Sequence, residues 1–404
     1  METKRKQRVL IIIHGTFYSS RQKLRGILRY NQDHDRWQIQ LVQNRPDDVT
    51  FSGKIARDVK GIITDMYSCG LFGTQIAAMN VPHLCLDFFG EAQYIPGSKF
   101  CQVNCDNAAA GRAGANHFLE RQYEHFGFVN DLKNRNWSLE REEAFVQTLA
   151  QNGKFCEIYR SKVHKEGTAA DELDDFRSLC AWLARLPKPA AIMAAMDSRA
   201  LQVMNACYEE RLSVPDDVAV LGLDNDTLLC QTCSPQLSSI PMCSEEAGYY
   251  GAQMLDLLMK DELGEKRIHT YGPKPIAIRE STNAVRYNDP LVSEALKFLW
   301  STSSLFVNVA EVAKELRVSR RLLEVRFKEA VGHPVIEEII RLRIDRVCGL
   351  LSHTNYPLSE IAAMCGFSCL SYLSRLFKRR TGKTLTEYRE EAGNKGISYF
   401  KRIK

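Results

Sequence analysis

Short apolar runs alternate with longer amphipathic stretches through the first 280 residues of the chain. Each run has the length of a buried strand, and each stretch keeps the spacing of a helix with one apolar face. The predicted strands are Val9–Ile13, Ile39–Val42, Gly61–Thr64, His83–Leu86, Cys101–Val103, His125–Val129, Phe155–Tyr159, Ala191–Ala195, Val218–Leu223 and Ile276–Ile278. The predicted helices are Ser20–Asn31, Ala108–Arg121, Glu140–Gln151, Leu173–Arg185 and Arg199–Glu210. This alternation indicates parallel sheets with crossover helices. Because about ten strands exceed one comfortable sheet, we expect two α/β lobes.

The pattern changes at Pro290, after which only helical spacing remains. A chain of 404 residues is also too long for a single ordinary core. We therefore expect a two-lobed α/β domain over residues 1–281 and an all-helical domain over residues 291–392. A polar linker over residues 282–290 would join them, and a basic tail over residues 393–404 would follow.

The helical part contains an internal repeat, Val312–Gly332 and Ile361–Gly382. Each copy has an apolar residue followed by Ala, a tight turn, a Ser, and then a helix that carries Phe-Lys and a closing Gly. Ser319 and Ser368 are placed to cap the second helix of each copy. Helical spacing of apolar residues from His333 to Leu351 predicts one long helix between the copies. The sequence therefore predicts two helix-turn-helix motifs on a shared helix.

Positive charge is concentrated in this same part of the chain. Residues 288–404 hold 20 Lys and Arg against 13 Asp and Glu, whereas the rest of the chain holds 34 and 36. This asymmetry favours a polyanion as the partner of the C-terminal domain alone. A domain with a merely basic face would show the same charge, so the repeat rather than the charge identifies DNA as the partner.

The repeat and its surroundings resemble the DNA-binding domain of the arabinose-regulator (AraC) family of transcription activators. The resemblance covers about 100 residues. It rests on Arg343–Leu351, Pro357–Ala362, Gly366-Phe367, Phe377-Lys378 and Gly382–Arg389. It implies that the second helix of each motif enters a major groove of DNA.

Exposed residues at the starts of these second helices are the predicted base readers. In the first motif they are Arg320, Arg321 and Glu324, since Arg pairs with guanine and Glu accepts from cytosine. In the second motif they are Leu370, Ser371, Ser374 and Arg375, where Leu370 could contact a thymine methyl. Phosphate contacts are expected from Ser319, Lys328, Lys378 and Arg379. For each residue, a merely solvated role is the alternative.

The N-terminal part resembles the periplasmic-binding-protein-like effector domain of the lac repressor family. The stretches that carry this resemblance are Val103–Gly114, Ala195–Ala200, Val214–Asp224 and Leu237–Pro241, in the expected order. That family begins with its own helix-turn-helix, whereas this chain starts directly on the first predicted strand. The resemblance implies a two-lobed sensor of a small molecule.

Polar and aromatic residues in loops at the carboxyl ends of the predicted strands are typical of a sugar site, because each hydroxyl both donates and accepts. The predicted ligand residues are Tyr18, Asp65, Asp87, Trp137, Arg141, Asp197, Asp224 and Asn225, with His14, Phe17 and Phe88 nearby. The family resemblance gives most weight to Arg141, Asp197 and Asp224. The alternative for each Asp is a helix cap, and for each aromatic residue a place in the core.

An effector domain of this kind with an AraC-type DNA-binding domain resembles the family of xylose-responsive transcription activators of bacteria. The resemblance implies a sugar-responsive regulator, with D-xylose or another pentose as effector. The expected partners are promoter DNA, RNA polymerase and a second copy of the chain in a homodimer. A regulator that answers to another carbohydrate, or whose N-terminal domain only dimerises or binds a partner, stays open.

Motifs of several enzyme classes are absent from the sequence: it has no GxGxxG after a strand, no P-loop, no GxSxG and no HExxH. We therefore expect no catalytic residue, no cofactor and no metal. The 13 cysteines show no disulfide or finger-like spacing, which favours reduced, buried thiols. No apolar run approaches the roughly 20 residues of a membrane span, and Val9–Ile13 is too short for a signal peptide. We expect a cytoplasmic protein.

Overall fold

The computed structural model describes residues 6–43, 58–66, 76–88, 99–161, 169–265, 267–284, 287, 289–300, 307–353 and 356–390. The chain forms two compact units, an N-terminal unit (Met1–His117 with Glu124–Thr282) and a C-terminal unit (Phe118–Tyr123 with Asn283–Lys404). The predicted bounds of the linker stay a prediction. The predicted tail, residues 393–404, lies outside the described residues.

The first lobe of the N-terminal unit is built on a six-stranded sheet in the order β11-β5-β4-β3-β1-β2, with every pairing parallel. Its central strands are buried from both sides, so they appear in the sequence as unbroken apolar runs. The strands are β1 (Gln7–Ile13), β2 (Trp37–Gln43), β3 (Val59–Asp65), β4 (His83–Leu86), β5 (Phe100–Cys105) and β11 (Ile268–Tyr271).

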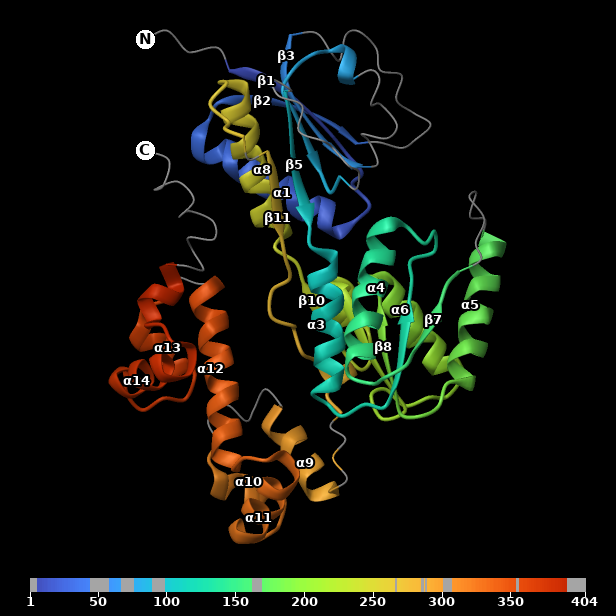
Figure 1. The fold of residues 1–404 in the computed structure, drawn as a ribbon, viewed down its shortest axis with the longest axis vertical. Coiled ribbons are helices and arrows are strands. Elements are labelled where there is room, and N and C mark those ends of the chain that lie inside the picture. Colours follow the sequence, from blue (N-terminus) through green and yellow to red (C-terminus); the bar gives the residue numbers. More distant parts are fainter. Residues whose placement is uncertain are drawn as a thin grey trace. The chain divides into compact units, whose positions relative to one another are not determined.

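Helices α1 (Tyr18–His34) and α8 (Ser244–Met259) pack side by side on this sheet (Figure 1). Glycines allow the close approach. A Cβ at Gly248 would lie 1.9 Å from the backbone oxygen of Lys23, and one at Gly26 would lie 1.9 Å from that of Glu245. The contact therefore fixes α1, whose first turns border the candidate ligand site.

The second lobe is built on a five-stranded parallel sheet in the order β10-β9-β8-β6-β7. Large apolar side chains such as Trp182 and Leu183 fill the core between this sheet and its helices. The strands are β6 (His125–Val129), β7 (Cys156–Tyr159), β8 (Ala190–Ala194), β9 (Val218–Asp224) and β10 (Ser238–Pro241). The helices are α3 (Asn107–Leu119), α4 (Asn136–Gln151), α5 (Ala169–Arg185), α6 (Asp197–Glu209) and α7 (Thr227–Thr232).

The two lobes share connections at which the chain passes from one sheet to the other. One passage joins β5 to α3, and a second joins β10 to α8. A third follows β11 and reaches the short 3-10 helix η1 (Glu280–Thr282). The second and third passages are tied by an antiparallel bridge between Met242 and Pro273. Parallel lobes joined in this way confirm the predicted two-lobed α/β fold.

The strand predicted at Ile276–Ile278 is wrong. The last strand of the first lobe, β11, lies earlier, at Ile268–Tyr271, where it pairs with β5. Within 276–278, Ala277 makes one isolated bridge to Ser239. Two prolines, Pro273 and Pro275, separate the two segments, and proline cannot donate to a strand ladder.

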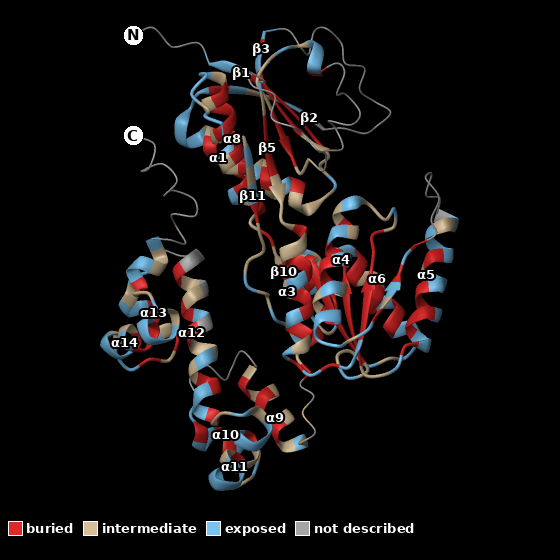
Figure 2. Ribbon diagram, viewed as in Figure 1, coloured by how far each residue is buried: buried red, intermediate tan, exposed pale blue. Residues whose placement is uncertain are grey.

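The C-terminal unit is helical and has two apolar cores. Helices α9 (Pro290–Trp300), α10 (Val309–Glu315) and α11 (Arg320–Val331) form the first with the start of α12 (Val335–His353). The rest of α12 forms the second core with α13 (Leu358–Met364) and α14 (Leu370–Thr381). Figure 2 shows the buried stripe along these helices. The two predicted helix-turn-helix motifs on one long shared helix are thus confirmed.

Buried and capping residues agree with most of the predicted repeat. Ala313 and Ala362 are buried, as are Phe327 and Phe377 on the second helices. Ser319 caps α11 by accepting from the amide of Leu322 at 3.2 Å.

The cap predicted at Ser368 is wrong, because Cys369 occupies the N-cap of α14 and makes no side-chain cap. One extra residue in the second turn shifts the helix start. In the turns themselves, Gly366 has φ +73° and its counterpart Arg317 has φ +54°, so both take the left-handed conformation that favours glycine.

Candidate ligand cleft and DNA-binding surface

Charged side chains from both lobes meet where the parallel strands end. Asp65 closes β3, Asp87 follows β4, and Asp224 closes β9. Asp224 lies within electrostatic reach of Asp87 and Lys23 from the first lobe and of Arg141 from the second. The structure therefore brings predicted residues of the two lobes together at the strand ends where such folds bind ligands, and we call this place the candidate ligand cleft.

Among the carboxylates of this cleft, Asp224 is the one whose side chain has no partner among the described residues. It has no hydrogen bond or ion pair with any residue that the structure describes, and its backbone has φ +102°. Its pKa is raised to about 6, chiefly by burial, with Arg141 and Lys23 opposing the rise and Asp87 and Asp226 adding to it. An unengaged carboxylate in such a place is an acceptor for two neighbouring hydroxyls.

Arg141 is a rigidly held donor on α4. Its Nε donates to the side-chain oxygen of Asn107 at 2.9 Å, and one terminal nitrogen donates to the backbone oxygen of Ala195 at 2.7 Å. Its guanidinium lies 4.6 Å from the ring centre of Trp137. The guanidinium is thus fixed in position before any ligand enters, and Trp137 provides an aromatic face beside it.

Asp197 is engaged within the protein. Its two carboxylate oxygens accept from Ser239 Oγ and from the backbone amide of Asp226, each at 2.6 Å. Burial raises its pKa to about 8, with Asp224 adding to the rise. Asp197 therefore supports the turn Asp224–Asp226, whereas the open carboxylate of that turn is the one of Asp224.

Asp87 forms a buried group with two residues that the sequence alone did not single out. Lys23 forms an ion pair with one of its oxygens, and Tyr271 donates to the other at 2.9 Å. Lys23 is only 3% exposed, and the backbone of Asp87 takes φ +55°. A lysine on a predicted amphipathic helix gives no signal in sequence, since its burial depends on residues that are far away along the chain.

The remaining predicted residues also lie at or just after the carboxyl ends of strands. Asp65 accepts from the backbone amide of His14 at 2.5 Å. The backbone amide of Asn225 donates to the hydroxyl of Ser239, and its side-chain oxygen accepts from Arg279 at 2.8 Å. Burial raises the pKa of the Tyr18 hydroxyl, and the nearby carboxylates of Asp226, Asp197 and Asp224 raise it further.

An open cavity of about 1030 Å³ lies beside this cleft, along α3 and α4. Asp224 and Arg141 are not among its lining residues, but Asn107 lines it and also holds Arg141. The charged groups rather than this cavity mark the candidate ligand site. The lining residues include Phe88, Asn104, Cys105, Asp106, Asn107, Arg112, Glu140 and Thr270.

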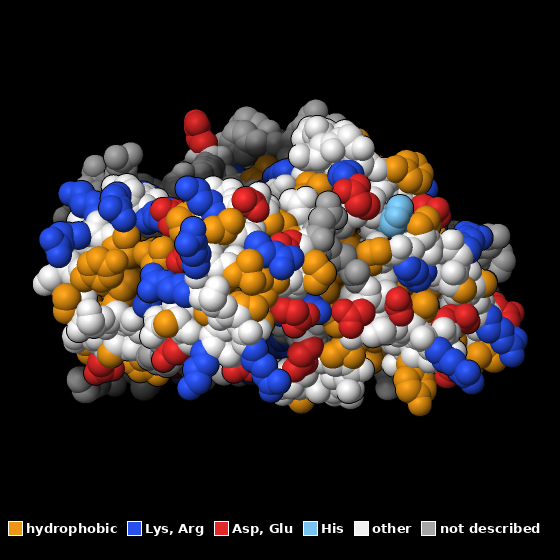
Figure 3. All heavy atoms as spheres, turned by 90° about the horizontal axis from the view of Figure 1, so that it is seen from below, with side chains coloured by type: hydrophobic (Ala, Val, Ile, Leu, Met, Phe, Trp, Pro, Cys, Tyr) orange, Lys and Arg blue, Asp and Glu red, His pale blue; other side chains and the backbone are white. Residues whose placement is uncertain are grey.

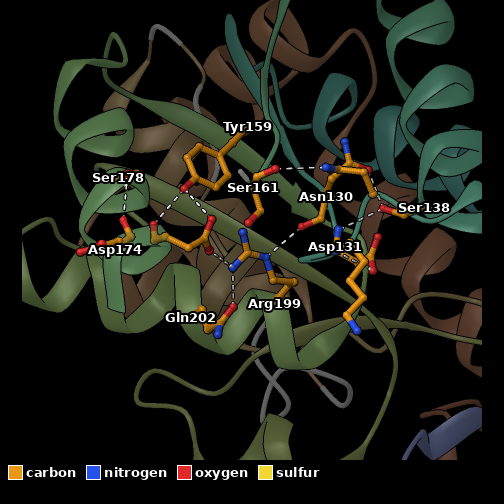
Figure 4. Close-up of polar contacts among 12 residues, drawn as sticks. Asn130, Asp131, Ser138, Tyr159, Ser161, Asp174, Ser178, Arg199 and Gln202 are labelled. Atoms are coloured by element: carbon orange, nitrogen blue, oxygen red, sulfur yellow. Dashed lines mark hydrogen bonds and ion pairs between the residues drawn. The ribbon is translucent and has the colours of Figure 1, made fainter. Parts of the chain in front are cut away.

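A buried polar network behind the cleft holds α4 and α6 in place (Figure 4). Arg199 donates to the backbone oxygen of Asn130 and to the carboxylate of Asp175, both at 2.8 Å. Tyr159 donates to the same carboxylate at 2.9 Å, and Ser138 on α4 bonds to Asn130. Because Arg199 follows Asp197 by two residues and Ser138 follows Trp137, the network fixes the helix starts that carry predicted ligand residues.

The first helix-turn-helix exposes the residues predicted to read bases. Arg320 and Arg321 are exposed at the start of α11, as are Ser319 and Lys328, and Glu324 is half-buried. Arg320 and Glu324 lie one helical turn apart with a nitrogen–oxygen distance of 3.9 Å. Arg326 points elsewhere and pairs with Asp289 at 2.6 Å through two bonds.

In the second helix-turn-helix, Ser371 and Arg375 are exposed on α14, as are Lys378 and Arg379. Ser374 is half-buried, and Leu370 packs partly against the core.

On the second helices of the two motifs, sequence reasoning missed three exposed apolar residues: Leu322, Val325 and Tyr372, which are 43%, 48% and 43% exposed. Lining up the two copies would have found Val325, because it stands where the second copy has Arg375. On the face that Figure 3 shows, hydrophobic side chains are exposed between separate Lys and Arg side chains.

Among the described residues, no group of three or more metal-ligating side chains gathers. The described helices include none that is long and apolar enough to cross a membrane.

A two-lobed domain with a charged cleft and a second domain with two helix-turn-helix motifs define the class of ligand-responsive transcription regulators. Family comparisons agree with both parts. Residues 115–282 match the family described as periplasmic binding protein-like domain, and residues 312–391 match a helix-turn-helix domain family of the AraC type.

Relatives of known name extend over most of the chain. The xylose operon regulatory protein of Haemophilus influenzae is 30% identical over 307 residues, which are 74% of this chain and 77% of the relative. The protein of the same name from Escherichia coli K12 is 31% identical over 293 residues, 71% and 73% of the two chains. The solved structure of a xylose-binding transcription activator has a TM-score of 0.60 and 25% identity, and the match covers 96% of this chain and 99% of that one. The chain belongs to the family of xylose operon regulatory proteins.

Proposed function

We propose that this regulator binds D-xylose in the cleft between its lobes and activates genes of pentose use in response. The carboxylate of Asp224, unpaired among the described residues and within electrostatic reach of the fixed guanidinium of Arg141, carries the proposal. Relatives that are named xylose operon regulatory proteins support the choice of sugar. The protein acts by binding rather than by catalysis, and it acts in the cytoplasm, where its promoter DNA lies.

In this proposal Asp224 accepts hydrogen bonds from two adjacent hydroxyls, and Arg141 donates to the ring or hydroxyl oxygens. Trp137 covers the apolar face of the pyranose ring, since aromatic rings combine large contact area with fixed geometry. Tyr18, Asp65, Asp87 and Asn225 border the sugar from both lobes. Asp197 acts from behind by holding the turn that carries Asp224.

DNA is bound by the starts of α11 and α14. Arg320, Arg321 and Glu324 read one major-groove segment, and Leu370, Ser371, Ser374 and Arg375 read the next. Ser319, Lys328, Lys378 and Arg379 bind phosphates and set the register. The regulator works as a homodimer that recruits RNA polymerase, and sugar binding closes the lobes and changes how the dimer engages its sites.

Titration calorimetry on the full chain with D-xylose, L-arabinose, D-ribose, D-glucose and D-glucuronate tests the sugar. Footprinting on the upstream DNA of neighbouring sugar genes, with and without the bound sugar, tests the regulation. We expect heat with D-xylose and a footprint that strengthens with it. Heat with another sugar alone would transfer the function to that sugar. Protection of DNA without heat from any sugar would favour an N-terminal unit that only dimerises or binds a partner protein.

A further inference from the structure

The segment that follows β1, residues His14–Arg21, connects the first lobe to the second. Arg21 on α1 reaches the carboxylate of Asp226 in the second lobe, with a nitrogen–oxygen distance of 3.6 Å. In the opposite direction, Arg135 of the second lobe places its guanidinium 5.4 Å from the ring centre of Phe17. We call these two contacts the clasp. A cation over an aromatic face and an ion pair are both attractive, so the clasp favours the closed arrangement of the lobes.

Each arginine of the clasp is held in place on its own lobe. Arg21 donates to the backbone oxygens of Gly15 at 3.2 Å and Thr16 at 2.8 Å. The side chain and backbone amide of Arg135 both bond to the carboxylate of Asp131, at 2.8 and 2.7 Å. Because the guanidinium groups are fixed before the lobes meet, little conformational entropy is lost when the clasp forms.

The partners of the clasp lie next to residues of the ligand site. Asp226 caps α7 through the amide of Leu228, and its own amide donates to Asp197. It follows Asp224 by two residues. Phe17 precedes Tyr18, and its ring lies 5.4 Å from that of His14. A change in the distance between the lobes therefore changes the clasp and the ligand site together.

We infer that Arg21 and Arg135 are positioning residues that hold the two lobes closed over a bound sugar through the clasp. The inference rests on the proposed function for the identity of the sugar. The ion pair is half exposed on the side of Arg21, and the second contact is a single cation over a ring. We therefore expect each to change sugar affinity only about threefold to fivefold, and both together roughly tenfold.

The test compares full-length Arg21→Gln, Arg135→Gln and the double variant with the wild type by stopped-flow binding of D-xylose. Matched controls are Arg25→Gln, on the same helix, and Lys133→Gln, in the same loop as Arg135. The double variant should release the sugar roughly tenfold faster with an association rate within about twofold, because the clasp, which also forms without sugar, must open before a bound sugar can leave. Arg21→Lys should release the sugar at close to the wild-type rate. The controls should match the wild type.

A second measurement does not depend on the sugar. Hydrogen exchange of residues 14–21 in the sugar-free protein should become faster in Arg21→Gln and Arg135→Gln but not in the two controls. Wild-type release rates in the double variant, or slower association in place of faster release, would overturn the clasp. If the wild type binds no D-xylose, the proposed function fails. The exchange of residues 14–21 then still decides the clasp, which is overturned if the variants exchange like the wild type.

Discussion

Replacing Asp224 by Asn should make the protein more stable and at the same time less able to bind its sugar. The pKa of Asp224 is raised from 3.8 to about 6 in the folded chain. Above pH 6 the folded protein therefore holds a carboxylate that the unfolded chain solvates better, and folding is opposed by this group. The penalty disappears as the pH falls from about 6 towards 4, because the carboxyl group then takes up a proton in the folded state first.

The size of the effect follows from this difference in pKa, which corresponds to about 3 kcal/mol. The attractions of Arg141 and Lys23 are already contained in it, since they lower the pKa. The side chain is only partly buried, and water screens a partly accessible charge, so we expect about 1–2 kcal/mol at pH 7.5. For an N-terminal unit of this size that is a rise of roughly 3–6 °C in the melting temperature.

Calorimetric melting of Asp224→Asn and the wild type at pH 7.5 and pH 5 measures the stability, and titration with D-xylose measures binding. The gain in melting temperature should shrink at pH 5, and affinity should fall roughly 10–100-fold with the loss of a charged acceptor. Asp226→Asn is the matched control. It should lower the melting temperature slightly, because Asn can still cap α7 but loses the ion pair with Arg21. An unchanged or lower melting temperature for Asp224→Asn at pH 7.5 would refute the reasoning.

Four further changes test other parts of the structure. Arg317→Gly should stabilise the first helix-turn-helix by about 1 kcal/mol in thermal melting, because Arg317 has φ +54°; a loss of stability would contradict this. Ser319→Ala should cost about 1 kcal/mol, whereas Ser368→Ala should cost nothing measurable, because only Ser319 caps its helix. Gly248→Ala should lower the unfolding free energy by about 2–3 kcal/mol in urea, since the new Cβ would meet the oxygen of Lys23; Gly264→Ala, with open space around it, is the control. Arg321→Ala should weaken operator binding by about 1–3 kcal/mol in gel shifts and relax the preference at one base pair, whereas loss of affinity that is equal for all sequences would mark a phosphate contact.

Much of the fold could be predicted because it depends on local patterns. The apolar runs that became β1 and β9 are buried on both faces and stand out in the sequence. The helix-turn-helix copies were found through the repeated Ala, Ser and Phe-Lys. The wrong cap at Ser368 and the wrong strand at Ile276–Ile278 both come from element boundaries, where one extra residue or a nearby proline shifts the start of an element.

The sequence by itself determined the two domains, the repeat on one long helix and the loops that carry the predicted ligand residues, because periodicity and turn residues act over short distances. Only the tertiary structure decided what each charged residue does. Asp197 and Asp224 look alike in sequence, yet one accepts two hydrogen bonds from the protein and the other accepts none from the described residues. Lys23 and Tyr271 joined Asp87 from distant parts of the chain. Roles of this kind depend on burial and on partners far apart in sequence, which become defined only when the lobes have packed.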